Sequence, residues 1–301
     1  MSFQVPLFNP KNVAESIAVR RGLTSAFSSS SSAPSTSLMS LPTVLPAVLP
    51  PVHEVHARAK EYVGPTPESN WVILGRLMVG AYPASAYDDS ENEQILESIL
   101  KCRVSTFVCL QQEYHHGAQE SMWRSGQCLR PYIEDAVEIC QKQKHSEIVP
   151  AEELKFLHHG IVDCGTTNDL TVLELAADVC NRLLLGEVIY LHCWGGHGRT
   201  GTVVAVALGL LYGLSASEAL MRTQLYHDLR VCNLNVGSPQ TLQQREQVIR
   251  ILTSLKTQAW FPKVPMIANL ASPSSPQAMP SPKFEKEIRT RAPSIAGWAG
   301  V

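Results

Sequence analysis

The stretch VIYLHCWGGHGRTGTVV, residues 188–204, decides how the rest of this 301-residue sequence is interpreted. An apolar run ends just before Cys193, three glycines follow within five positions, and a second apolar run begins after Arg199. This order predicts a buried strand (187–192), a glycine-rich loop and then a helix (200–213). In an open α/β sheet, ligands bind where a strand ends and its helix begins.

The loop has the residue types of an anion-binding site. A helix N-terminus supplies free N–H groups and the positive end of the helix dipole. Gly195, Gly196 and Gly198 let successive amides turn inward around a group the size of a phosphate. Arg199 adds a planar fork that holds two phosphate oxygens. The same positive field favours the thiolate of Cys193, which is a nucleophile towards a bound phosphate monoester.

HCWGGHGRTG, residues 192–201, matches the H-C-x5-R-[S/T] signature of the protein tyrosine phosphatase superfamily. Roughly residues 70–257 resemble the dual-specificity type, and the Trp-Gly-Gly order is similar to that of cyclin-dependent-kinase-associated phosphatases. The resemblance implies a phosphatase-like fold and a phosphocysteine intermediate. It assigns Cys193 as nucleophile and Thr200 as a hydroxyl donor to the sulfur. It also implies a set of phosphate-binding residues: Trp194, Gly195, Gly196, His197, Gly198 and Arg199.

The leaving group needs a proton, which a nearby carboxylic acid supplies in this superfamily. The segment FLHHGIVDCGTTND, residues 156–169, resembles the corresponding loop, with Asp163 as the general acid. Gly160 stands where the kinase-associated relatives usually have proline. Asp169 is the alternative acid, but we interpret it as the N-cap of the helix 170–185.

Hydrolysis of the phosphocysteine needs a positioned water molecule. SPQTLQQREQV, residues 238–248, resembles the Q-T-x-x-Q segment of the tyrosine phosphatases. This resemblance implies that Gln240 positions the water and that Gln244 supports it. The alternative is that both are surface glutamines at the start of an amphipathic helix.

Hydrophobic periodicity predicts an α/β fold with a central mixed, mostly parallel sheet and helices on both faces. The expected strands lie at 71–82 (two short strands around a Gly-Arg turn), 104–110, 154–163 and 187–192. The expected helices are 91–102, 132–142, 169–186, 200–213, 215–229 and 238–256.

Composition divides the chain into three parts. Residues 1–65 are rich in serine and proline, residues 66–257 form the predicted phosphatase domain, and residues 258–301 are again rich in proline and serine. We expect both end segments to be disordered. Residues 1–40 carry several basic residues and a single acid, Glu15, which is also typical of a transit peptide. The sequence therefore predicts a cytoplasmic protein or, with a transit peptide, one of plastids or mitochondria.

The net charge, the length of the apolar runs and the spacing of the cysteines limit the possible partners and cofactors. The net charge of −2 argues against a nucleic-acid binder, and no apolar run is long enough to span a membrane. None of the eight cysteines forms a C-x-x-C pair, and the phosphatase chemistry requires no metal or other cofactor. We expect a phosphorylated protein as substrate, and a monomer is compatible with the sequence.

Substrate class and redox control follow from the same resemblance. The sequence lacks the K-N-R-Y-type motif of the tyrosine-specific enzymes, so phosphoserine and phosphothreonine are expected substrates beside phosphotyrosine. No lysine lies in the loop, which disfavours inositol phosphates.

Cys109 is the first candidate to form a disulfide with an oxidised Cys193, and Cys164 is the second. The alternative is that both are ordinary structural thiols. A catalytically weak module that binds phosphoproteins is the alternative function.

Overall fold

The computed structural model describes residues 44–142 and 148–257, and they form one α/β domain. Its centre is a five-stranded sheet in the order β1-β2-β5-β3-β4. β1 and β2 form an antiparallel hairpin, whereas β2, β5, β3 and β4 are parallel neighbours. The predicted mixed, mostly parallel sheet is therefore confirmed. The strands are β1 (Asn70–Ile73), β2 (Leu77–Gly80), β3 (Thr106–Gln111), β4 (Lys155–Ile161) and β5 (Ile189–His192).

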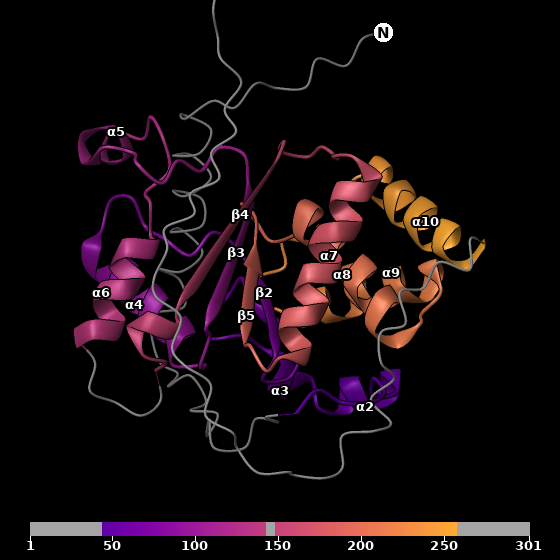
Figure 1. Cartoon of the computed structure of the whole chain (residues 1–301). Coiled ribbons are helices and arrows are strands. Elements are labelled where there is room, and N and C mark those ends of the chain that lie inside the picture. The colour runs from indigo at the N-terminus through magenta and orange to yellow at the C-terminus, as the bar shows by residue number, and fades with distance from the viewer. Residues whose placement is uncertain (1–43, 143–147, 258–301) are drawn as a thin grey trace, which may run out of the picture. The chain divides into compact units, whose positions relative to one another are not determined.

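Helices cover both faces of this sheet, as the sequence predicts. α4 and α6 lie on one face, and α7, α8, α9 and α10 pack together on the other (Figure 1). The larger helices are α4 (Asp89–Leu100), α6 (Ile133–Lys142), α7 (Asp169–Leu184), α8 (Gly198–Tyr212), α9 (Ala216–Asp228) and α10 (Leu242–Thr257). The short ones are α2 (Val52–Ala57), α3 (Ala59–Tyr62), α5 (Glu120–Arg124) and the 3-10 turn η2 (Ala151–Glu153).

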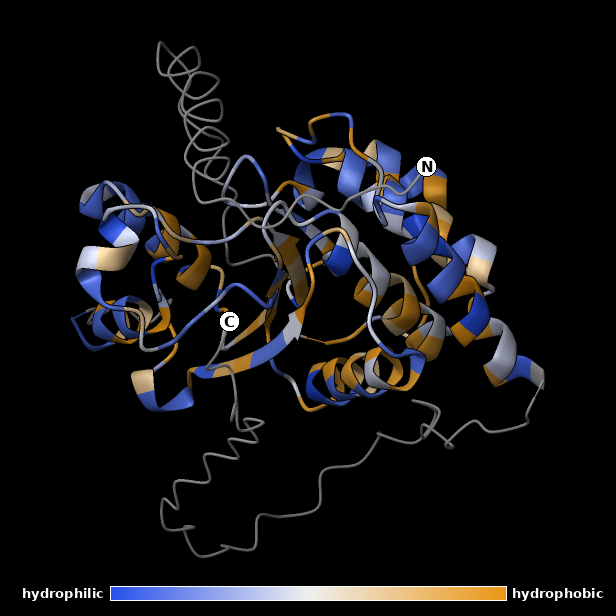
Figure 2. Cartoon of the chain, turned by 90° about the horizontal axis from the view of Figure 1, so that it is seen from above, coloured by the Kyte–Doolittle hydropathy of each residue, from blue (hydrophilic) through white to orange (hydrophobic). Residues whose placement is uncertain are grey.

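The central elements are apolar because they are enclosed on all sides. β5 is buried along its whole length, and α8 is buried from Gly198 to Gly209. Figure 2 shows the hydrophobic colour on the central strands and on parts of the surrounding helices. α8 ends at Gly213, whose φ of 65° is a left-handed conformation that glycine adopts without strain.

Parallel pairing brings the carboxyl ends of four strands to one edge of the sheet. Gly80 at the end of β2 and Cys109 near the end of β3 are both register partners of His192. Residues that follow these strands therefore lie close to Cys193, the first residue after β5. This edge is where the sequence predicts the functional site.

The prediction that residues 1–65 hold no packed element is wrong for residues 44–65. This segment forms α2 and α3, and the Nη1 of Arg222 in α9 donates a hydrogen bond to the carbonyl of Pro50 at 2.6 Å. Proline prevents a long helix there but not the burial of the apolar residues between the prolines. The segment buries four apolar side chains in the core: Leu45, Leu49, Val55 and Tyr62.

The other predictions for the end segments lie outside the described residues. These are the predicted disorder of 1–43 and 258–301 and the transit peptide. Within the described residues, no helix is both long and apolar enough to span a membrane.

Candidate active site

Residues 193–199, here called the cysteine loop, connect β5 to the first turn of α8. Cys193 is buried at the start of this loop. Gly196 has a φ of 71°, and a Cβ added there would lie 2.2 Å from the carbonyl oxygen of Gly80 in the neighbouring strand. A Cβ on Gly198 would lie 2.7 Å from the side-chain amide of Gln244. Glycine is therefore required at position 196, where the loop passes close to β2, whereas a side chain at position 198 would displace the Gln244 amide.

Arg230, which follows α9, holds the outer side of the cysteine loop. Its Nη1 and Nη2 donate to the carbonyls of Gly195 and Gly196 at 3.1 and 2.9 Å, and its Nε donates to Asn70 Oδ1 at 2.6 Å. Both Arg230 and Asn70 are buried. Because both carbonyls accept hydrogen bonds from Arg230, their acceptor groups are occupied, which is compatible with a loop whose amides bind an anion.

His197 packs its side chain against α9 rather than into the site. Its Nδ1 lies 2.7 Å from Nε2 of His227, and its carbonyl accepts a hydrogen bond from Ser238 Oγ at 3.0 Å. Burial, and then the nearby Arg230, lower the pKa of His227 to about 3, so this ring is neutral. The side chain of His197 therefore fixes the loop to α9, and the predicted phosphate contact of His197 stays a prediction.

The guanidinium of Arg199 is buried between two carboxylates from neighbouring strand ends. Nη1 donates to Glu113 Oε2 at 3.0 Å and to the carbonyl of Ile161 at 2.9 Å, and Nη2 donates to Asp163 Oδ1 at 2.7 Å. Burial works to lower the pKa of Arg199, but Cys193, Glu113 and Asp163 together outweigh it and raise the pKa. Arg199 therefore stays charged beside Cys193 and is fixed in orientation.

His192, the last residue of β5, is a neutral buried ring directly before the cysteine. Its Nε2 lies 2.6 Å from the hydroxyl of Tyr132, and its Nδ1 lies 3.3 Å from the carbonyl of Cys193. Burial lowers the pKa of His192 to about 3. The ring therefore fixes the position of the Cys193 backbone without adding a charge.

Residues 162–168, here called the acid loop, follow β4. Asp163 begins a turn in which the amide of Gly165 donates to the carbonyl of Val162 at 3.0 Å. The side chain of Asp163 is 56% exposed even though it pairs with Arg199. The structure thus brings Asp163 and Arg199, two of the predicted site residues, together in a direct ion pair, and the role of Asp163 as general acid stays a prediction.

The alternative acid, Asp169, is engaged elsewhere. It accepts hydrogen bonds from Gln247 and Arg250 of α10 at 2.9 and 3.0 Å. The prediction that Asp169 caps the following helix is wrong by one position. Asn168 is the N-cap, because its Oδ1 accepts from the amide of Leu170 at 2.8 Å.

Gln240, Gln244 and Thr200 differ in their exposure and in their hydrogen bonds. Gln240 is exposed, whereas Gln244 is buried and its Nε2 donates to the acid-loop carbonyl of Gly165 at 3.0 Å. Gln244 also packs on Gly198, so it touches both loops. The water-positioning role of Gln240 stays a prediction. Thr200 Oγ1 is buried and makes no hydrogen bond within the described part of the chain, so the predicted bond to the Cys193 sulfur is not formed here.

The two candidate redox partners, Cys109 and Cys164, both lie close enough to Cys193 to interact with it electrostatically. Cys109 is buried beside His192, and burial raises the pKa of its thiol to about 12. Cys164 is an exposed residue next to Asp163, and the partial burial of its thiol, followed by the Asp163 charge, raises the pKa of that thiol. Both shifts favour the unreactive thiol form, so a structural role for these cysteines stays open beside the redox role.

Three residues of the site escaped the sequence analysis: Glu113, His227 and Arg230. Glu113 had a weak signal, because it is an acid shortly after a predicted strand. His227 and Arg230 had none, since they lie in and after a helix with no recognisable motif.

The chain belongs to the family described as "PTP-SAK: Swiss Army Knife protein, DSP-PTPase phosphatase domain", whose model matches residues 66–261. It is also 35% identical over 102 residues to a protein named "Putative tyrosine phosphatase 067L" from Invertebrate iridescent virus 3. That match spans 32% of this chain and 41% of the viral protein. The expected membership of the dual-specificity phosphatases is thereby confirmed.

Solved structures similar to the chain include further phosphatases. Tk-PTP in its active form is 21% identical, with a TM-score of 0.42, and covers 62% of this chain and 97% of its own. Kinase associated phosphatase with its catalytic-site cysteine replaced by serine is 18% identical, with a TM-score of 0.42. That match covers 60% of this chain and 87% of the other. Human DUSP28 is 12% identical, with a TM-score of 0.38, and the match covers 60% of this chain and 92% of the other.

Proposed function

We propose that this domain hydrolyses phosphate monoesters of proteins, on tyrosine and on serine or threonine, through a phosphocysteine intermediate. The observation that carries the proposal is the placement of Arg199. A buried, charged guanidinium is held by Glu113 and Asp163 beside Cys193, at the N-terminus of α8. A phosphate dianion there meets the arginine, the loop amides and the helix dipole together.

The first step transfers the phosphoryl group to the protein. The Cys193 thiolate attacks phosphorus, the bond from phosphorus to the ester oxygen breaks, and Asp163 donates a proton to the leaving oxygen. The partly exposed Asp163 side chain borders solvent, where a substrate would reach it. Arg199 and the loop amides stabilise the charge on the transferring oxygens.

The second step regenerates the enzyme. Water attacks the phosphocysteine, Asp163 takes up its proton, and the bond between sulfur and phosphorus breaks to release inorganic phosphate. The Thr200 hydroxyl, buried and without a partner in the described residues, is available to donate to the departing sulfur. Gln244 is the glutamine that contacts both loops, so we assign it the task of fixing their relative position.

The first experiment measures hydrolysis of p-nitrophenyl phosphate with reductant and without added metal. Wild type, Cys193→Ser and Asp163→Asn are compared, with Asp169→Asn as the matched control for the acid. We expect the wild type to hydrolyse this substrate. The rate should fall by about 10⁴-fold or more in Cys193→Ser and stay at the wild-type level in Asp169→Asn. Phosphotyrosine and phosphothreonine peptides then define the substrate class.

Other results would redirect the assignment. An inactive wild type whose Cys193→Ser form still binds phosphopeptides would indicate a binding module. Full activity in Asp163→Asn would place the general acid elsewhere. Full activity in Cys193→Ser would refute the phosphocysteine mechanism.

A further inference from the structure

A cavity of about 300 Å³ lies beside the cysteine loop and shares Trp194 with it. We call it the α4 pocket. Its walls come from residues 65–68 before β1, residues 81–85 after β2, and one side of α4. Cys193, Arg199 and Asp163 do not line it. The pocket is thus a neighbour of the candidate active site and not a part of it.

The aromatic wall of this pocket is joined directly to the cysteine loop. The amide of Tyr82 donates to the carbonyl of Trp194 at 2.9 Å, and their rings stack with centroids 6.0 Å apart. The hydroxyl of Tyr190 in β5 donates to the carbonyl of Ala81 at 2.7 Å. A ligand in the α4 pocket would therefore contact Trp194, the residue next to the proposed nucleophile.

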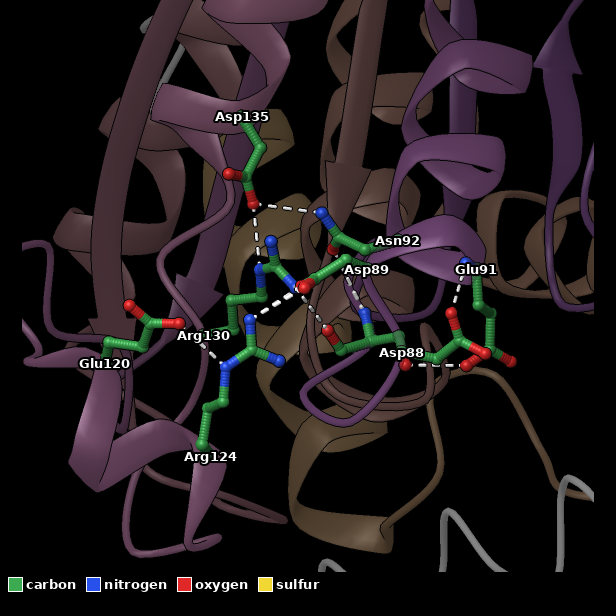
Figure 3. A network of polar contacts seen from close by, with 9 residues as sticks. Asp88, Asp89, Glu91, Asn92, Glu120, Arg124, Arg130 and Asp135 are labelled. Carbon is green, nitrogen blue, oxygen red and sulfur yellow. Dashed lines mark hydrogen bonds and ion pairs between the residues drawn. The ribbon is translucent and has the colours of Figure 1, made fainter.

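A polar network around the buried residues Asn92 and Arg130 fixes the opposite wall (Figure 3). Asn92 of α4 accepts a hydrogen bond from the amide of Ser85 at 3.2 Å and donates to Asp135 at 2.9 Å. Arg130 donates to the carbonyl of Ser85 at 3.2 Å and to the carboxylates of Asp89 and Asp135 at 2.6 and 2.9 Å. Because Asn92 and Arg130 are buried, the pocket wall is preformed.

The lining combines carboxylates with aromatic and proline rings. Glu68 and Glu91 are its charged residues, and no lysine or arginine lines it. The carboxylate of Glu68 makes no hydrogen bond or ion pair within the described residues. Glu91 accepts a hydrogen bond from Ser85 Oγ at 2.6 Å, which holds its carboxylate at the wall. Such a lining suits a cation carried on an apolar stem.

Arginine meets these conditions better than the other cationic side chain, lysine. Its guanidinium is planar, so it stacks on an aromatic ring and forks towards a carboxylate at the same time. The lysine ammonium is a compact, strongly hydrated charge, so it loses more hydration free energy than a guanidinium on entering an aromatic pocket. We propose that the α4 pocket binds an arginine side chain of the phosphoprotein substrate, within a few residues of the phosphorylated one. This inference rests on the proposed phosphatase function and adds a sequence preference to it.

The test uses phosphopeptides that carry one arginine at successive positions on either side of the phosphorylated residue. Each has a partner peptide with citrulline, which keeps the shape and removes the charge. We expect kcat/KM to be about tenfold higher with arginine at one or two adjacent positions. Glu68→Gln and Glu91→Gln reduce this preference, and Glu68→Lys reverses it in favour of glutamate. Glu93→Gln, an exposed position on α4 outside the pocket, is the matched control.

Hydrolysis of p-nitrophenyl phosphate separates this proposal from the function on which it rests. We expect the glutamate variants to hydrolyse that small substrate as wild type does. If wild type hydrolyses it but shows no arginine preference at any position, the pocket assignment is wrong and the phosphatase stands. A preference that survives in Glu68→Gln and Glu91→Gln also overturns the assignment. Absence of turnover with every substrate overturns both proposals.

Discussion

The cysteine loop and the acid loop meet at Arg199, but they are held in different ways. The cysteine loop is buried and is fixed by Arg230, His227, Ser238 and Gln244. In the acid loop, Val162, Asp163 and Cys164 are exposed. Its backbone contacts with α10 include hydrogen bonds from the side chain of Gln244 to the carbonyl of Gly165 and from that of Gln247 to the carbonyl of Thr167.

The difference matches what each loop is proposed to do. A phosphate site stabilises its transition state through donors that are in place beforehand, so its loop has to be preorganised. A general acid has to reach leaving groups of different shapes and exchange protons with solvent, which favours an exposed side chain. The same edge of the sheet thus carries one buried and one open loop. The predictions below test this contrast, from the largest expected effect to the smallest.

The same glycine-to-alanine change should destabilise the protein much more in the cysteine loop than in the acid loop. In Gly196→Ala the new Cβ meets the Gly80 carbonyl at a left-handed φ, so we expect the unfolding free energy to fall by more than about 3 kcal/mol. In Gly165→Ala the nearest atom is 3.2 Å from the new Cβ and φ is ordinary, and we expect a change below about 1 kcal/mol. Denaturant unfolding of both variants measures this. Equal losses would show that the loops are equally constrained.

The two carboxylates on Arg199 should affect different kinetic constants. We expect Asp163→Asn to lower kcat by about 100-fold for a peptide substrate, because the leaving oxygen loses its proton donor. Glu113→Gln should mainly raise KM, since it loosens the arginine that binds phosphate. Steady-state kinetics on one phosphopeptide separates the two effects. Identical changes in kcat and KM would mean that both residues only position Arg199.

Removing the outer support of the cysteine loop should cost stability as well as activity. Arg230→Met leaves two loop carbonyls and Asn70 without their buried donor, which we expect to lower the unfolding free energy by about 2 kcal/mol. Arg250→Met removes an exposed arginine that pairs with Asp169 near the acid loop, and there we expect little change. Thermal unfolding compares them. A stable Arg230→Met variant would contradict the description of the cysteine loop as preorganised.

Acid should destabilise the folded protein through His192, the buried histidine directly before the cysteine loop. Folded His192 stays neutral down to about pH 3, whereas in the unfolded chain it takes up a proton below about pH 6.5. The unfolded state then binds more protons, so stability present above pH 6.5 is lost as the pH falls, by about 1.4 kcal/mol per pH unit.

The matched variants for this pH effect are His192→Gln and His159→Gln. His192→Gln should flatten the pH dependence of the unfolding free energy between pH 6 and pH 4. Burial also lowers the pKa of His159 on β4, but that ring is partly exposed, so His159→Gln should flatten it less. Urea unfolding at several pH values gives both slopes. An unchanged slope in His192→Gln would show that the ring is protonated in the folded protein.

Much of the fold was predictable because its signals are local. The alternation of apolar strands and amphipathic helices gave every central strand and every long helix to within a few residues. Residues 44–65 were mispredicted because serine and proline in the preceding stretch suggested disorder, whereas burial of Leu45 and Leu49 depends on α9 and the rest of the core. Local composition carries no information about such a distant partner.

The sequence by itself determined the proposed nucleophile and phosphate-binding arginine, because Cys193 and Arg199 belong to one short strand–loop–helix unit. Only the tertiary structure decided what holds that unit. Glu113 lies 86 residues from Arg199 along the chain, and Arg230 lies 35 residues from Gly195. The α4 pocket likewise joins three separate segments around Trp194. Such contacts depend on how strands are ordered in a sheet and how helices pack on it, and no local pattern of residues encodes that arrangement by itself.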